Sequence, residues 1–173
     1  MTTDADRTGR LRDRGASRAA PLCARMLAVL VAASTVAGIA GAADPTAVTA
    51  VSYRVVADGV PEPLAARPGD AARGRALVVA REPANCVLCH AVPDAAVQFS
   101  GDLGPSLTGI GARLSVAQLR LRVANNLRVN PATIMPGYYN VDGLDRVAPN
   151  YRGKPILSAS ETEDIVAYLA TLR

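Results

Sequence analysis

Two cysteines three positions apart, followed at once by a histidine, constrain this chain of 173 residues more than any other feature. In Cys86-Val87-Leu88-Cys89-His90 the two thiols are spaced for covalent attachment to the vinyl groups of a haem. The adjacent imidazole is then placed to bind the haem iron. The motif therefore predicts one covalently bound haem c, with Cys86 and Cys89 as attachment points and His90 as the proximal ligand.

The ligand on the other face of the iron must be something other than imidazole, because His90 is the only histidine. A methionine thioether is the usual alternative. Of the three methionines, Met1 and Met26 lie in the N-terminal leader described next, which leaves Met135. Methionines more often fill gaps in apolar cores, but a haem needs a sixth ligand and no other strong candidate remains. We predict that Met135 is the distal ligand.

The chain opens with a basic segment followed by an apolar one. Residues 1–25 contain six arginines, and Met26–Ala43 has no charge and ends in small residues. This order is typical of a secretory signal peptide and predicts a leader of residues 1–42, cleaved near Ala42, and a periplasmic mature protein. The alternative is an uncleaved anchor, but the apolar run of 18 residues falls short of the roughly 20 strongly apolar residues that a membrane span needs. We expect no membrane anchor after cleavage.

Removal of this leader changes the charge balance of the chain. The full sequence has a net charge of +4, but the leader holds six of the 19 basic and three of the 15 acidic residues. The mature chain therefore has 13 basic and 12 acidic side chains, a net charge of about +1 before the haem propionates are counted. Most of the basicity is discarded, which argues against nucleic-acid binding.

The cysteine count excludes several other classes of function. Cys23 lies in the leader, so the mature chain keeps only Cys86 and Cys89, and the haem uses both. No thiol remains for a disulfide, a structural zinc site or a catalytic nucleophile. A thioredoxin-type redox pair conflicts with the histidine that follows directly.

The mature chain divides into an N-terminal arm, residues 43–68, and one domain, residues 69–173. The arm contains four prolines, and its sequence leaves open whether it is a disordered tail or lies along a partner subunit.

In the domain we expect a helix from Asp70, as N-cap, to about Arg81. Capping-box patterns that begin at Ser115 and Ser158 predict two further helices, up to Asn130 and to the C-terminus.

Three packing expectations follow from the same residues. Gly74 in the first helix predicts a close contact with the last helix, at Tyr168. In the second helix, the apolar face is expected at Val116, Leu119, Val123 and Leu127, and the solvated side at Arg113, Arg120, Arg122 and Arg128. The chain has no Trp and one Phe, so the haem must fill volume that aromatic side chains usually occupy.

Several segments in one order resemble class I cytochrome c over residues 69–173. They are Asp70–His90, Gly104–Leu107, Met135-Pro136 and the terminal helix. The resemblance implies an all-α fold whose helices pack around the haem, here preceded by an extended N-terminal arm. It also implies that the Pro105 carbonyl accepts a hydrogen bond from His90.

A narrower resemblance is to SoxX, the monohaem subunit of the SoxAX sulfur-oxidation complex. It rests on four segments: Gly101–Leu107, Asn130–Pro136, Val147–Pro149 with Tyr151–Pro155, and Glu163–Leu169. The family implies a heterodimer with a SoxA cytochrome, an L-cysteine S-thiosulfotransferase that couples thiosulfate to a cysteine of the SoxYZ carrier. Electrons then pass to a downstream acceptor cytochrome. With no catalytic thiol on this chain, its part would be electron transfer.

Two other functions compete with this one. A free-standing soluble cytochrome that delivers electrons to a terminal oxidase would share the haem chemistry but lack the partner. The arm and residues 151–155 exceed what a minimal carrier needs, and we interpret them as subunit-contact surface. A gas sensor or peroxidase would need an open sixth site on the iron. The sequence argues against such a function, because Met135 is available to occupy that site.

Overall fold

The computed structural model describes residue 50 and residues 52–173, so the predicted signal peptide, residues 1–42, lies outside the described residues. Four α-helices form the domain: α1 (Ala71–Val79), α2 (Ile110–Arg113), α3 (Val116–Asn125) and α4 (Ala159–Thr171). Short 3-10 turns occur at Cys86–Leu88, Asn126–Arg128 and Pro149–Tyr151. The described residues contain no strand, only an isolated bridge between Val56 and Gly59. The all-α prediction is therefore confirmed.

The predicted helix starts are correct, because each is fixed by a side chain close to it in sequence. The Asp70 carboxylate accepts a hydrogen bond of 2.9 Å from the Arg73 backbone N–H. Both capping boxes form, with Ser115 opening α3 and Ser158 opening α4. The ends differ from expectation: α1 ends at Val79, and α3 ends at Asn125, where the chain tightens into a 3-10 turn.

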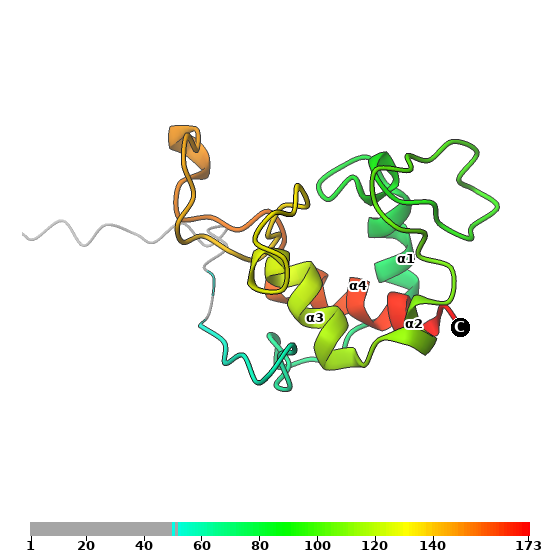
Figure 1. Ribbon diagram of the computed structural model, residues 1–173, viewed down its shortest axis with the longest axis horizontal. Helices are drawn as coiled ribbons and strands as arrows, with labels where there is room; N and C mark the ends of the chain where they lie inside the picture. Colours follow the sequence, from blue (N-terminus) through cyan, green and yellow to red (C-terminus); the bar gives the residue numbers. More distant parts are fainter. Residues whose placement is uncertain (1–49, 51) are drawn as a thin grey trace, which may run out of the picture. The chain divides into compact units, whose positions relative to one another are not determined.

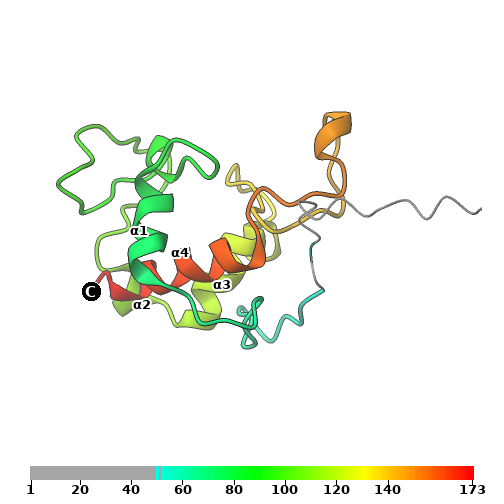
Figure 2. The same ribbon diagram turned by 180° about the vertical axis from the view of Figure 1, so that it is seen from behind.

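Helix α4 is the centre of the fold, and α1, α2 and α3 all pack against it. Figures 1 and 2 show α1 crossing α4, with α3 alongside α4. A Cβ atom on Gly74 would lie 1.8 Å from the Asp164 carbonyl oxygen and 2.9 Å from the Tyr168 Cβ. The predicted close contact is therefore present, but Gly74 faces the backbone of α4 at Asp164 rather than the ring of Tyr168.

Gly74→Ala is expected to destabilise the haem-loaded protein by at least about 3 kcal/mol, because the added methyl meets a backbone carbonyl that cannot rotate away. Chemical denaturation followed by circular dichroism measures the loss. Gly109→Ala is the matched control: Gly109 has a φ of 67° and no atom within 4 Å of an added Cβ, so only backbone strain of about 1 to 2 kcal/mol is expected. Equal losses in the two variants would contradict this description of the crossing.

The prediction that Arg120 lies on a solvated side of α3 is wrong. Arg120 is 4% exposed, and its Nε and Nη2 donate to the two carboxylate oxygens of Glu163 at 2.7 and 3.0 Å. Its Nη1 also donates to the Val60 carbonyl at 2.6 Å. The N-terminal arm covers this side of the helix, and the charge is buried because a bidentate carboxylate accompanies it.

The expected apolar face of α3 is only half correct. Leu119 and Val123 are buried, but Val116 and Leu127 are 47% and 39% exposed, because they lie at the two ends of the helical segment. Of the other arginines that we expected in solvent, Arg113 and Arg128 are exposed and Arg122 is half-buried. Helix α3 is buried on more than one side, and a single stripe does not describe it.

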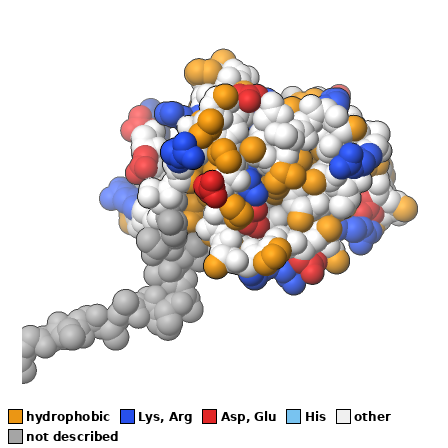
Figure 3. All heavy atoms as spheres, turned by 90° about the horizontal axis from the view of Figure 1, so that it is seen from below, with side chains coloured by type: hydrophobic (Ala, Val, Ile, Leu, Met, Phe, Trp, Pro, Cys, Tyr) orange, Lys and Arg blue, Asp and Glu red, His pale blue; other side chains and the backbone are white. Residues whose placement is uncertain are grey.

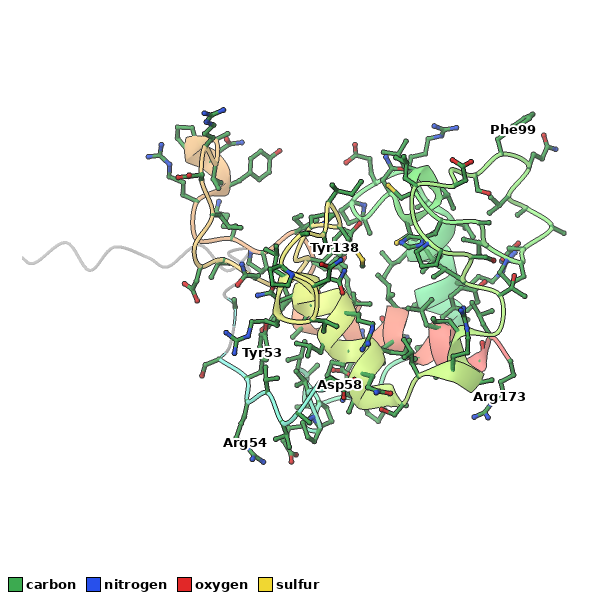
Figure 4. All side chains as sticks on the ribbon, viewed as in Figure 1. Tyr53, Arg54, Asp58, Phe99, Tyr138 and Arg173 are labelled. Atoms are coloured by element: carbon green, nitrogen blue, oxygen red, sulfur yellow. The ribbon has the colours of Figure 1, made fainter. Side chains whose placement is uncertain are left out.

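Residues 52–68 of the arm lie along the domain's own helices. This differs from both alternatives that the sequence left open, a disordered tail and an arm along a partner subunit. Val60 is fully buried, and its N–H donates to the Ala117 carbonyl at 2.9 Å. The Leu64 N–H donates to Glu163 Oε1 at 2.8 Å. Further back, the ring of Tyr53, which is labelled in Figure 4, has its centroid 6.2 Å from that of the Tyr139 ring. This part of the arm is thus a structural layer over α3 and α4.

Asp164 on α4 joins the arm to α1. Its carboxylate accepts from the guanidinium groups of Arg67 at 2.8 Å and Arg73 at 2.9 Å, and from the Asp70 N–H at 2.7 Å. Burial alone would raise the pKa of Asp164, but these hydrogen bonds outweigh it and hold the pKa well below its ordinary value. The carboxylate therefore stays charged and keeps the start of α1 on α4.

Candidate functional site

A cavity of about 570 Å³ lies between the Cys86–His90 turn, α3 and the loop that follows α3. All five predicted site residues line it: Cys86, Cys89, His90, Pro105 and Met135. A smaller adjoining cavity reaches the core side chains Val78, Leu157, Ile165 and Leu169. The candidate site is thus continuous with the centre of the domain.

The haem motif forms a single tight turn. The N–H groups of Cys89 and His90 both donate to the Cys86 carbonyl, at 3.2 and 3.0 Å. Asn85, in the left-handed region with a φ of 50°, leads into this turn. Both cysteine side chains are partly buried, and before haem attachment burial raises the pKa of the Cys86 thiol to about 11. An uncharged thiol in this position is not suited to act as a thiolate nucleophile.

The His90 ring is fixed from two sides. Its Nδ1 lies 2.7 Å from the Pro105 carbonyl oxygen, and since a carbonyl only accepts, Nδ1 carries the proton. The lone pair of Nε2 is then free to bind a metal. A Cβ on residue 104 would lie 2.4 Å from the ring, so Gly104 is required for this close approach. The Gly104 N–H donates to the Cys89 carbonyl at 2.8 Å, which ties the glycine to the haem motif.

Met135 reaches the cavity from the loop between α3 and residue 138, and it packs partly buried against the core. The buried Tyr138, labelled in Figure 4, donates from its hydroxyl to the Ala84 carbonyl at 2.8 Å. Burial raises the pKa of Tyr138, so the hydroxyl remains a donor. This bond joins the Met135 loop to the segment just before the haem motif.

The cavity fits a haem in size and in chemistry. Its volume is within the roughly 300 to 1,000 Å³ of pockets that bind small molecules and cofactors. Its wall supplies two thiols, an imidazole with a free Nε2 and a thioether, among mostly apolar neighbours. Polar side chains of α3 and the following loop also line it: Arg122, Asn126, Asn130 and Thr133. Such a wall suits a flat apolar macrocycle that carries carboxylates.

The mouth of the cavity is apolar. Leu103 and Ile134 both line the cavity and are 70% and 78% exposed. On the face seen in Figure 3, acidic and basic side chains are interspersed, and neither sign of charge forms a large patch. At Leu103 and Ile134, the exposed part of the cavity wall is apolar.

Comparison with known proteins identifies the family. The family model for cytochrome c matches residues 71–173, which span α1 to the C-terminus and include the whole cavity wall described above. The chain belongs to the cytochrome c family. As a c-type cytochrome it carries a covalently bound haem c and transfers electrons.

A solved structure is similar to this cytochrome over most of its length. The crystal structure of SoxXA from P. pantotrophus contains a chain with 35% sequence identity and a TM-score of 0.66. The match covers 73% of this chain and 98% of that one. It confirms the resemblance to SoxX.

No curated protein matches this chain. Among the described residues, no helix is long and apolar enough to cross a membrane.

Proposed function

We propose that this cytochrome is the SoxX-type subunit of a periplasmic SoxAX complex and transfers electrons during thiosulfate oxidation. The observation that carries the proposal is the 35% identity to a chain of SoxXA, nearly all of which the match covers. The predicted signal peptide of residues 1–42 supports the periplasmic location.

In this proposal the five site residues have separate roles. Cys86 and Cys89 would form the two thioether bonds, and His90 and Met135 would be the two protein ligands of the iron. The Pro105 carbonyl orients the imidazole through the bond to Nδ1 and increases its basicity. When bound, haem c supplies a one-electron ferric/ferrous couple. Histidine and methionine together favour the ferrous state and hence a comparatively high reduction potential.

The sulfur chemistry is assigned to the partner proteins. Joining thiosulfate to a cysteine of the SoxYZ carrier is an oxidation that releases two electrons, and it needs a reactive thiolate. This chain has no cysteine beyond the two that hold the haem once the leader is removed. It would accept electrons from the SoxA-type subunit and pass them to a downstream cytochrome.

One segment is suited to contact the SoxA-type partner. Residues 142–156, the projecting segment, extend away from the four helices in both Figure 1 and Figure 2. They include Leu144, Tyr151 and Ile156, which are exposed by 45%, 64% and 46%. Since residues 52–68 are already packed on their own domain, we assign the partner contact to the projecting segment rather than to the arm.

Co-expression with a SoxA-type cytochrome should give a heterodimer on gel filtration, and thiosulfate with the SoxYZ carrier should then reduce the haem.

Tyr151→Ala in the projecting segment is expected to weaken the heterodimer at least about tenfold, since buried aromatic side chains dominate interfaces. Phe99→Ala is the matched control, because Phe99 is 84% exposed at the end of a different loop (Figure 4). A monomer under these conditions would instead support a free-standing carrier.

A further inference from the structure

We propose that Asn126 and Thr133 form a positioning pair that controls how readily Met135 leaves the iron. The pair acts through the backbone of the Met135 loop, not by touching the metal. This inference rests on Met135 being the distal ligand, as proposed above.

The centre of the pair is the Thr133 hydroxyl, which accepts two hydrogen bonds. The Met135 backbone N–H donates to Thr133 Oγ1 at 3.1 Å. The side-chain Nδ2 of Asn126 donates to the same oxygen at 2.9 Å. Asn126 begins the 3-10 turn that follows α3, so the hydroxyl connects the methionine to the end of a packed helix.

Asn126 also anchors the other end of the loop. Its carbonyl accepts from the Asn130 N–H at 2.9 Å, and the Asn130 carbonyl accepts from the Thr133 N–H at 3.1 Å. The Asn130 side chain accepts from the Ala132 N–H at 3.1 Å. The segment from Asn126 to Thr133 is therefore a compact unit, and the Thr133 hydroxyl extends it to Met135.

Between Thr133 and the buried Gly137 the loop has few backbone hydrogen bonds. Among the described residues 134–137, the Met135 N–H is the single backbone donor with a hydrogen bond. The next backbone bonds come from Tyr138 and Tyr139, which donate to the carbonyls of Val123 and Ala124 at 3.2 and 3.0 Å. Ile134 is 78% exposed and adds little packing. The hydroxyl therefore has a larger share in fixing Met135 than a single side chain usually has.

Loss of the hydroxyl should shift an equilibrium between iron-bound and released Met135. Carbon monoxide binds reduced haem iron only when the sixth position is free, so its apparent affinity rises with the released fraction. Thr133→Val keeps the shape of the side chain and removes the acceptor of both bonds. We expect it to raise the apparent affinity for carbon monoxide about tenfold. It should also weaken the thioether-to-iron charge-transfer band of the oxidised protein.

The other variants separate positioning from general destabilisation. Thr133→Ser retains the hydroxyl and should restore near wild-type affinity for carbon monoxide. Asn126→Ala removes one of the two bonds and should raise that affinity about threefold. The double variant should not exceed Thr133→Val, because both changes act through one oxygen. Thr171→Val removes a hydroxyl that donates to the Tyr168 carbonyl at 2.6 Å in α4, and it should leave carbon monoxide binding unchanged.

Met135→Ala serves as the reference for a fully open site. If it does not raise carbon monoxide affinity, Met135 is not the distal ligand and the proposed site itself fails. If it does, but Thr133→Val matches wild type, or Thr133→Ser is impaired as much as Thr133→Val, the positioning pair alone is refuted. An Asn126→Ala effect that adds in full to that of Thr133→Val would also refute it.

Discussion

Replacing both Cys86 and Cys89 by alanine should leave a haem-free chain with no cooperative unfolding transition. The core has little aromatic bulk: the chain has no Trp, and its single Phe, Phe99, is 84% exposed. The haem cavity of about 570 Å³ adjoins core residues such as Leu157 and Ile165. Without the haem, the apolar wall of this space would be exposed to water, and burial of apolar surface is the main favourable term behind the roughly 5 to 15 kcal/mol that holds a whole domain together.

Thermal unfolding followed by far-ultraviolet and near-ultraviolet circular dichroism tests this expectation. The haem-loaded wild-type protein, purified in the same way, is the control and should melt in one sharp transition. The double variant should show reduced helix content and a gradual, non-cooperative loss of signal. A sharp melting transition in the double variant would mean that the polypeptide builds its core without the haem.

The helix starts could be predicted because their determinants are local. In the capping boxes of Ser115 and Ser158, each hydrogen bond spans three residues. The surroundings of Arg120 could not be predicted, because its partners Val60 and Glu163 lie 60 and 43 residues away in sequence. Nothing in the periodicity of α3 indicates that the arm returns to cover it.

In the candidate site, too, local features could be predicted from the sequence and long-range contacts could not. The motif and the single histidine indicate which residues belong together, and the structure places all five in one cavity wall. The bond from Tyr138 to Ala84 spans 54 residues and has no sequence signal. Thr133 does have one: it is a hydroxyl two residues before Met135, although its two bonds are visible only in the folded loop.

The central claim is that an imidazole and a thioether hold one haem iron in this cytochrome, and Met135→Ala tests it most directly. We expect the variant to lose the thioether-to-iron charge-transfer band and to bind carbon monoxide when reduced. Its reduction potential should fall by on the order of 0.1 V, because axial ligands set much of the range of haem potentials. Phe99→Ala, at a residue that is 84% exposed and does not line the cavity, should change none of these properties. A Met135→Ala protein with the wild-type spectrum and potential would contradict the claim.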